Sequence, residues 1–442
     1  MSKWLETTIG DQATLQRGID ITKVEQRPGK VPVISSGGIS SYHDTVGVKD
    51  PGVVLGRKGV VGSVFYVEED YWPHDTSLWV KDFHGNYPRF VYYFFKSVAP
   101  QIARMDVGSA NPTLNRNHVH PMTIVWPPLA EQKAIAAVLG ALDDKIELNR
   151  RMNATLEAMA RALFQSWFVD FLPVRANMDR NSPPLRRTQT GDPVRAKLDG
   201  RPPAALDPAT AALFPATFQD SPIGPVPKGW KVERFDAHIT ADRGLSYKGE
   251  GLRDDRTGLP MHNLNSVYEG GGYKHEGLKY YGGEYREKHL LNPGDMIVTN
   301  TEQGFDHLLI GHAAIVPRCY GPKGIYSHHI YRVRHKPTSP FSPHYLVELF
   351  NNRRWHYWIS GFSNGTTINM LPMDALEMPM LVVPPVELVK KFTALAEATH
   401  LQVEDNKQQS RTLATLRDTL LPKLLSGELS VAGNESKLEV AR

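Results

Sequence analysis

Two groups of loops in this 442-residue chain carry side chains that could recognise nucleic acid. In the first half, Arg57 and Lys58 lie between two short hydrophobic runs, and a polar loop with a glycine covers residues 108–115. In the second half, residues 300–303 follow a matching hydrophobic run, and a second Gly-containing polar loop covers residues 361–369. Arg and Lys pair with guanine edges and Asn or Gln with adenine, while Ser and Thr contact either base or phosphate. The glycines would let backbone amides approach phosphate closely.

A basic and aromatic segment, residues 243–248, offers further contacts of the same kind. The residues that we predict to contact nucleic acid are Arg57, Lys58, Ser109, Asn111, Thr113, Asn115, Arg243, Tyr247, Lys248, Asn300, Thr301, Gln303, Asn364, Thr366, Thr367 and Asn369. The alternative interpretation is that Asn and Thr occur there because they are good turn residues, and that residues 243–248 form a solvated loop.

Motifs for catalysis are incomplete. Residues 182–185 contain two prolines but lack the aromatic residue of a methyltransferase Pro-Pro motif, and we interpret them as linker. Asp295 and Glu302 have the spacing of a Mg²⁺-dependent nuclease, but Gly304 stands where the lysine should be. The two histidines at 328–329 would point to opposite faces of a strand, so a packing or surface role is favoured over metal binding. We predict no catalytic residue, no metal site and no cofactor in this chain.

The elements that would position these loops occur twice. A Pro-Gly turn leads into a short β-branched run in each half, which predicts a buried strand. A second strand, an amphipathic helix after a proline, and a last strand follow in both halves. The repeated elements are 51–55 and 293–298, 62–67 and 311–316, 88–95 and 343–350, and 122–125 and 380–383. Because the repeat is degenerate, one copy could have diverged to recognise something different from the other.

Each half ends in a long helical pattern that begins at a double proline. Aligning Pro127 with Pro384 places Asn149 on Asn406. Apolar residues at three- and four-residue steps predict a coiled-coil seam, on which an Asn costs stability but restricts register. The predicted seams are Ile135, Val138, Leu142, Ile146, Asn149, Met152, Leu156, Met159 and Leu163 in the first helix, and Phe392, Leu395, Val403, Asn406, Leu413, Leu416, Leu420 and Leu424 in the second. Pro422 predicts a kink or an end near that position.

Two such helices in one chain would pack on each other. About 42 helical residues span roughly 60 Å, and an antiparallel pair is the economical arrangement if a long connector lets the chain return. Two modules that read the same face of a duplex must stand about one helical turn, roughly 34–36 Å, apart. We interpret the helix pair as a ruler between two recognition domains and as a docking surface. The alternative is that the helices are only core.

We therefore predict an α+β chain in which two similar mixed α/β globular domains are separated by two long helices packed as an antiparallel coiled coil. Between the halves, a Pro-rich stretch cannot form one continuous helix or strand ladder and is interpreted as an extended connector on the surface. The predicted parts are a first recognition domain 1–127, a first long helix 128–171, the connector 172–228, a second recognition domain 229–383, a second long helix 384–428, and a tail 429–442.

Composition is that of a soluble globular protein, with 41% hydrophobic and 22% charged residues. The net charge of +4 is thinly spread, so any binding to nucleic acid must come from local placement of Arg and Lys. The single Cys319 excludes a disulfide framework and fits a reducing cytoplasm. No apolar run approaches the ~18 residues of a membrane span, and the first residues lack a signal-peptide core. We expect a cytoplasmic protein without membrane contact.

At this point several stretches match a known family. The chain resembles the specificity subunit of type I restriction–modification systems over essentially its whole length. The stretches that carry the resemblance are 126–135, 142–149, 163–171 and 416–428. Each stretch alone is weak, but together and in this order they are highly specific.

The resemblance implies two target-recognition domains, each reading one half of a split sequence in double-stranded DNA. It implies that the helices set the unread spacer and recruit two modification (methyltransferase) subunits, which bring S-adenosylmethionine. Restriction and translocase subunits, with ATP and Mg²⁺, would join the same assembly. The chain itself would be a non-catalytic recognition and scaffold subunit. Two rival functions are a self-contained restriction–modification enzyme and a coiled-coil bridging protein that does not touch DNA.

Overall fold

The computed structural model describes residues 4–49, 51–105, 113–181, 206–303, 306–365 and 368–431. The chain forms two compact units. Unit 1 consists of Met1–Arg150 and Gln409–Arg442, and unit 2 consists of Arg151–Gln408. Each unit therefore combines one globular domain with parts of both long helices.

Unit 1 is built around a four-stranded sheet with the order β2-β8-β5-β6 and a three-stranded sheet with the order β4-β3-β7. A separate pair, β1 with β9, joins the start of the domain to its last strand. The elements are β1 (Leu5–Thr8), α1 (Ile9–Gln12), β2 (Thr14–Arg17), β3 (Val31–Ser35), β4 (Gly38–His43), β5 (Gly52–Gly56), β6 (Val64–Val67), β7 (Trp72–Pro73), β8 (Ser77–Asp82), α2 (Pro88–Ala103), α3 (Arg116–Val119) and β9 (Thr123–Trp126).

Unit 2 repeats this plan with additions. Its four-stranded sheet has the order β13-β22-β18-β20, and a five-stranded sheet with the order β14-β16-β15-β21-β17 takes the place of the three-stranded one. The strands are β10 (Phe218–Gln219), β11 (Val226–Pro227), β12 (Lys231–Arg234), β13 (Ile239–Arg243), β14 (Leu252–Arg253), β15 (Leu259–His262), β16 (Lys279–Tyr281), β17 (Leu290–Leu291), β18 (Met296–Thr299), β19 (Thr301–Gln303), β20 (Ala313–Ile315), β21 (Gly324–Tyr326), β22 (Ile330–His335), β23 (Ile368–Met370) and β24 (Met380–Val383). The helices of its globular part are α8 (Pro343–Asn351), α9 (Arg353–Ser360) and α10 (Asp374–Glu377).

The central strand of each four-stranded sheet is buried on both faces. On β5, Val53 and Leu55 join the core under α2, whereas Val54 joins a second cluster on the opposite face. On β18, Met296 and Val298 join the main core of unit 2, whereas Ile297 joins a separate cluster. Because side chains alternate along a strand, such a strand must be apolar throughout. The predicted repeat of two strands, a helix and a last strand is confirmed in both units.

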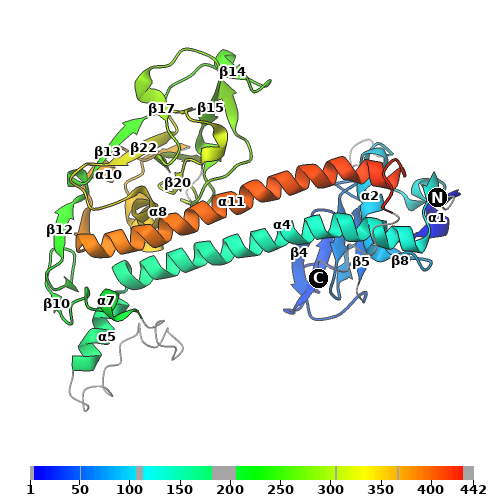
Figure 1. Ribbon diagram of the computed structural model, residues 1–442, viewed down its shortest axis with the longest axis horizontal. Helices are drawn as coiled ribbons and strands as arrows, with labels where there is room; N and C mark the ends of the chain where they lie inside the picture. The colour runs from blue at the N-terminus through cyan, green and yellow to red at the C-terminus, as the bar shows by residue number, and fades with distance from the viewer. Residues whose placement is uncertain are drawn as a thin grey trace. The chain divides into compact units, whose positions relative to one another are not determined.

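The two long helices are α4 (Leu129–Phe164) and α11 (Val386–Leu425), drawn in cyan and in orange to red in Figure 1. In unit 1 they run antiparallel. Arg417 Nη1 donates to Asp143 Oδ1 at 2.5 Å, and Asn149 Nδ2 donates to Gln409 Oε1 at 2.8 Å and to Ser410 Oγ at 3.2 Å. Asn149 is fully buried, so its amide constrains which residues can face each other across the pair.

The helices also pair antiparallel in unit 2, where Asn406 Nδ2 donates to Asn153 Oδ1 at 2.8 Å and the rings of Phe164 and Phe392 lie 5.5 Å apart. Helix α4 follows the globular domain of unit 1 but ends in the core of unit 2. Helix α11 follows the globular domain of unit 2 but ends in the core of unit 1. Residues after Phe164 continue as a π-helical turn, Gln165–Val169, and pack in unit 2, while Leu421 packs in unit 1. The predicted α+β fold with an antiparallel pair of long helices is confirmed.

Three residues of the predicted seams do not lie in the buried interface between the long helices. Met159, Leu395 and Leu416 are 63%, 52% and 46% exposed. Because 3.6 residues per turn do not match a 3.5-residue repeat, a straight helix drifts and its seam passes to neighbouring positions such as Ala396, which is buried. Pro422 stays within α11, and the helix ends three residues later at Leu425.

The interpretation of residues 172–228 as an extended connector is corrected where the structure describes them. Residues Leu172–Asn181 form helix α5, and Pro208–Ala211 form helix α7. Val174 and Phe214 are buried in the core of unit 2. These apolar side chains fold the described parts of the segment onto unit 2 because burying them removes them from water. In the described part of the chain, no helix is long and apolar enough to cross a membrane.

Candidate nucleic-acid interface

In unit 1, the end of strand β5 brings two of the predicted loops together. Arg57 N donates to Thr76 O at 2.9 Å, and Leu114 N donates to Arg57 O at 2.9 Å. An isolated β-bridge joins Lys58 to Thr113. Lys58 and Thr113 therefore lie side by side although they are far apart in the sequence. We call the main-chain contacts among residues 57, 58, 76, 113 and 114 the frame of unit 1.

The side chains on this frame gather positive charge around one carboxylate. Arg17 Nη2 lies 2.9 Å from Asp75 Oδ2, and Lys58 Nζ lies 3.8 Å from the same oxygen. Arg57 Nη1 donates to the main-chain oxygen of Asp75 at 3.2 Å. Burial alone would raise the pKa of Asp75, but the hydrogen bond from Arg17 and the charges of His74 and Lys58 lower it. Arg17 and Lys58 thus share one ionised acid, and Arg57 binds the main chain of the same residue.

Burial and the charge of Arg17 lower the pKa of Arg57, and Asp75 opposes this effect. Arg17 was not among the predicted residues. The signal that identifies it is a short repeat: Arg17-Gly18-Ile19 in unit 1 occupies the place of Arg243-Gly244-Leu245 in unit 2. A Cβ on Gly18 would lie 2.0 Å from His74 O, and one on Gly244 would lie 2.2 Å from Ser327 O. Only glycine allows this close approach of two main chains.

Unit 2 contains the same frame. Asn300 N donates to His329 O at 3.1 Å, and Leu371 N donates to Asn300 O at 2.8 Å. Strand β19 pairs with β23, so that Thr301 faces Met370. Asn300 therefore corresponds to Arg57, and Leu371 to Leu114. The expectation of a loop at 300–303 is corrected, because residues 301–303 form a strand.

Three predicted residues of unit 2 are buried in its frame. Asn300, Thr301 and Asn369 are 0%, 2% and 5% exposed. Asn300 Nδ2 donates to His328 O at 3.0 Å, and Thr301 Oγ1 lies 3.0 Å from His329 Nδ1. The side chains of Asn300 and Thr301 hold the frame together. That these three residues contact a base edge stays a prediction.

The other predicted residues differ in how far their side chains are exposed. Those with exposed side chains are Lys58, Asn115, Arg243, Lys248, Gln303 and Asn364, while Arg57, Thr113 and Tyr247 are partly exposed. Ser109, Asn111, Thr366 and Thr367 lie outside the described residues.

Residues 243–248 lie beside the frame of unit 2. Arg243 Nε donates to His328 O at 3.4 Å, and its Nη2 lies 3.6 Å from the sulfur of Met370 on β23. The rings of Tyr247 and His328 lie 6.4 Å apart. The structure therefore brings three separate predicted segments of unit 2 to one place.

His328 and His329 lie in the turn between β21 and β22, so the expectation that they sit on a strand is corrected. Their ring centroids are 3.9 Å apart. Burial, the neighbouring His328 and the charge of Arg243 all lower the pKa of His329. Within the described ranges, no group of three or more His, Cys, Asp or Glu side chains is placed to hold a metal ion.

The acids with nuclease-like spacing have structural partners. Arg334 Nη2 donates to Asp295 Oδ2 at 2.7 Å. The carboxylate of Glu302 accepts the amides of residues 308, 309 and 310 at 2.8, 3.1 and 2.9 Å. Asp295 thus fixes one end of β18 through Arg334, and Glu302 orders residues 308–310.

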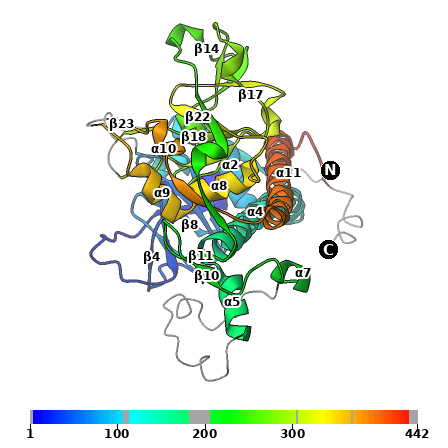
Figure 2. The same cartoon turned by 90° about the vertical axis from the view of Figure 1, so that its left-hand side faces the viewer.

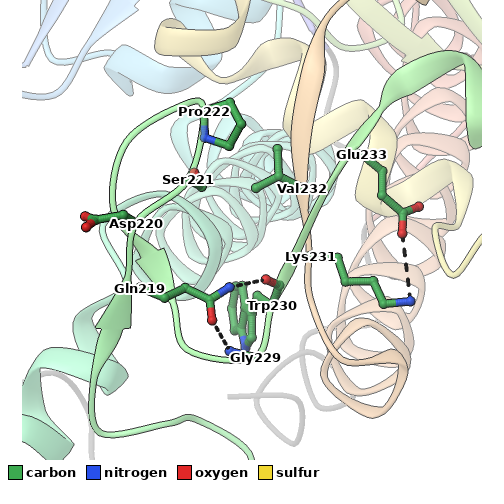
Figure 3. Close-up of a pocket in the computed structure, with 9 residues that line it drawn as sticks. All are labelled: Gln219, Asp220, Ser221, Pro222, Gly229, Trp230, Lys231, Val232 and Glu233. Carbon is green, nitrogen blue, oxygen red and sulfur yellow. Dashed lines mark hydrogen bonds and ion pairs between the residues drawn. The ribbon is translucent and has the colours of Figure 1, made fainter.

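A hollow of about 480 Å³ lies beside the β10–β11 hairpin of unit 2 (Figure 3). The Gln219 side chain donates to Trp230 O at 2.9 Å and accepts from Gly229 N at 2.9 Å. Lys231 and Glu233 on its rim form an ion pair at 4.0 Å. Its polar groups tie the hairpin to β12, and we assign no recognition role to it.

Comparison with known proteins identifies the class of domain. The family model described as "Type I restriction modification DNA specificity domain" matches residues 1–158, which comprise the globular domain of unit 1 and most of α4. These residues are therefore similar to a DNA specificity domain of that description.

Two relatives are similar over most of their length. The chain is 24% identical to the type I restriction enzyme MjaIX specificity subunit of Methanocaldococcus jannaschii. The alignment covers 78% of this chain and 70% of the relative. It is 23% identical to the type I restriction enzyme HindI specificity subunit of Haemophilus influenzae, over 72% of this chain and 71% of the relative. The resemblance to type I specificity subunits is confirmed.

A solved structure has the same fold. The S subunit of a type I restriction–modification system from M. genitalium aligns with a TM-score of 0.58, covering 95% of this chain and 96% of that one. Sequence identity is 13%, so the likeness lies in the fold.

Proposed function

We propose that this chain is the DNA-recognition and scaffold subunit of a type I restriction–modification complex, and that it reads a bipartite target in double-stranded DNA. The observation that carries the proposal is the repeated frame. The bonds from Leu114 to Arg57 and from Leu371 to Asn300, at 2.9 and 2.8 Å, place polar segments at the same point of each unit. Two such frames give one chain two similar places to hold a duplex.

Local charge supports DNA as the ligand. Arg17, Arg57 and Lys58 surround a single carboxylate in unit 1, which leaves positive charge for phosphates or guanine edges. In unit 2, Arg243, Lys248 and Gln303 are exposed near the frame. Phosphate contacts would position each unit, and the side chains that reach base edges would determine the sequence read.

The paired helices would set the number of unread base pairs between the two half-sites. The amides of Asn149 and Asn406 bridge the helix pair in each unit and hold its register. Inserting four residues after Arg150 and four before Gln409 would lengthen the pair by about 6 Å. At about 3.4 Å per base pair, we expect an unread spacer longer by about two base pairs. A methylation map with an unchanged spacer would mean that the helices are not the ruler.

The exposed apolar residues of the long helices would dock partners. Met159 and Leu416 occupy equivalent positions of α4 and α11, one in each unit, and both are exposed. One such site per unit fits two modification subunits. We propose that catalysis, S-adenosylmethionine, ATP and Mg²⁺ belong to those and to the restriction and translocase subunits, and that the assembly acts in the cytoplasm.

The test is DNA binding with and without the methylating partner. Because the units are nearly neutral overall, we expect the chain alone to bind its target weakly, and the complex to bind tightly and methylate it. A gel-shift series with the target duplex and a scrambled duplex measures this. Tight sequence-specific binding by the lone chain would contradict the division of labour. Methyl transfer from labelled S-adenosylmethionine by the lone chain would favour the rival, a self-contained enzyme.

A further inference from the structure

Helix α9 of unit 2 presents an unusual surface. Four of its eight residues are exposed, namely Arg353, Arg354, Tyr357 and Trp358. Tyr357 is 83% exposed and Trp358 is 40% exposed. Since positions three and four apart share a helix face, Arg354, Tyr357 and Trp358 form one cationic and aromatic surface. Figure 2 shows α9 beside α8.

The two arginines are not placed to stabilise the free helix. They occupy the first turn, where the helix dipole is positive and each added cation costs about 0.3–1 kcal/mol. The amide of Arg354 is already capped by Asn352 Oδ1 at 3.1 Å. Neither guanidinium forms an ion pair within 4.0 Å with a carboxylate of the described ranges. An anion bound from outside would relieve this repulsion.

Helix α9 is rigidly joined to the frame of unit 2. Its buried residues Trp355 and Ile359 belong to the main core. Immediately after the helix, Asn364 and Met370 exchange two main-chain hydrogen bonds, at 2.9 and 2.8 Å. Met370 lies on β23, next to Arg243. The segment that follows α9 therefore links the helix to the candidate nucleic-acid interface.

We propose that α9 binds the phosphate backbone of the duplex beside the half-site read by unit 2, with Arg353 and Arg354 as the phosphate ligands and Tyr357 packed against the sugar–phosphate edge. This inference rests on the proposed DNA-recognition function. It applies to unit 2 alone, because the last turns of α2 in unit 1, Ser97–Ala103, contain no arginine or lysine. The contact strengthens binding without reading sequence.

The test uses the full chain assembled with its methylating partner and the double variant Arg353→Gln/Arg354→Gln. Two phosphate contacts contribute about −1.8 to the slope of log K against log salt. Between about 50 and about 200 mM salt, wild-type affinity should therefore fall about tenfold more than that of the variant. The matched control is Lys288→Gln/Lys323→Gln, which removes the same charge from exposed positions of the same unit and should keep the wild-type slope.

The outcomes separate this inference from the proposed function. A shallower salt slope with an unchanged methylated sequence supports the phosphate contact. Wild-type slope and affinity in the arginine variant overturn it while leaving the proposed function intact. Loss of co-purification with the methylating partner overturns it too, because α9 would then be a protein-docking surface. If the wild-type complex does not prefer its target to a scrambled duplex, the proposed function itself fails.

Discussion

The frames of the two units share their main chain and differ in their side chains. Arg57 in unit 1 and Asn300 in unit 2 each donate a main-chain N–H to a neighbouring turn and accept one from a leucine. Both side chains also donate to the main-chain oxygen of the corresponding residue, Asp75 or His328. Yet unit 1 places three cations around a carboxylate, whereas unit 2 buries an amide next to two histidines. The difference teaches that the main-chain structure of the interface can stay the same while the side chains available for recognition change.

A second contrast lies on the helix that covers each sheet. Tyr93 of α2 donates its hydroxyl to Asp143 of α4 at 2.7 Å. The corresponding residue of α8 is Glu348, which lines a hollow of about 300 Å³ together with Arg161 of α4. Burial raises the pKa of Glu348 to about 7, and the charge of Arg161 only partly offsets this. The same helix position therefore holds a tyrosine bonded to a carboxylate in unit 1 and a poorly solvated acid in unit 2.

The largest expected effect comes from exchanging one whole domain. If residues 1–127 are replaced by the corresponding domain of another specificity subunit, one half of the target should change completely and the other half should stay the same. The exchange must keep the packing of Leu421 and Leu424 against the unit 1 core and the bond from Trp4 Nε1 to Glu131 at 2.9 Å. Methylation mapping measures the outcome. A change in both halves would contradict the modular account.

A smaller change tests whether the frame side chains carry the difference between the units. The variant Arg57→Asn/Lys58→Thr gives unit 1 the residues of unit 2. Each lost base contact should cost about 1–3 kcal/mol, so affinity for the target should fall about 5- to 150-fold for each contact that the variant removes. Preference at guanine positions of one half-site should relax. Binding to a panel of single-base variants measures this.

The matched control for this variant is Lys81→Gln, which removes an exposed cation of strand β8. We expect it to keep the wild-type preference at every position. If the double variant at 57–58 loses affinity equally for all duplexes, the two residues are phosphate ligands and the sequence is read elsewhere in unit 1.

The smallest effect is on the free energy of unfolding, and it distinguishes helix α8 of unit 2 from helix α2 of unit 1. Because the folded state of unit 2 favours the protonated form of Glu348, stability is fully present below pH 4.5 and is lost as the pH rises towards about 7. The variant Glu348→Gln should therefore be more stable than the wild type by about 1–2 kcal/mol at about pH 8, allowing for partial solvent access. The two proteins should converge near pH 4.5.

Urea denaturation over this pH range measures the difference, with unit 2 followed by a probe near α8. The exposed Glu397→Gln on α11 serves as the control and should follow the wild type at every pH. A pH-independent difference for Glu348→Gln would mean that packing, and not ionisation, distinguishes the two side chains.

Much of the fold could be predicted because its strongest signals are local. The Pro-Gly turn before Val53, the proline at the start of each covering helix and the double proline before each long helix depend only on neighbouring residues. The fate of the polar residues could not be predicted this way. Lys58 and Thr301 stand at equivalent positions after a buried strand, but Thr301 is buried in the β19–β23 pair of unit 2, whereas Lys58 of unit 1 is exposed. Met159 and Leu416 matched an apolar period that the straight helices do not keep.

The sequence by itself determined that the chain is a repeat, that each copy ends in a long amphipathic helix, and that the polar segments follow strands. These features follow from short-range sterics and from the period of apolar residues. Only the tertiary structure decided that Arg17 joins Arg57 at Asp75, that Asn300 is part of the frame, and that α9 carries two arginines next to the frame of unit 2. Those facts depend on contacts between residues far apart in the chain, and side chains of identical type become buried or exposed according to what packs over them.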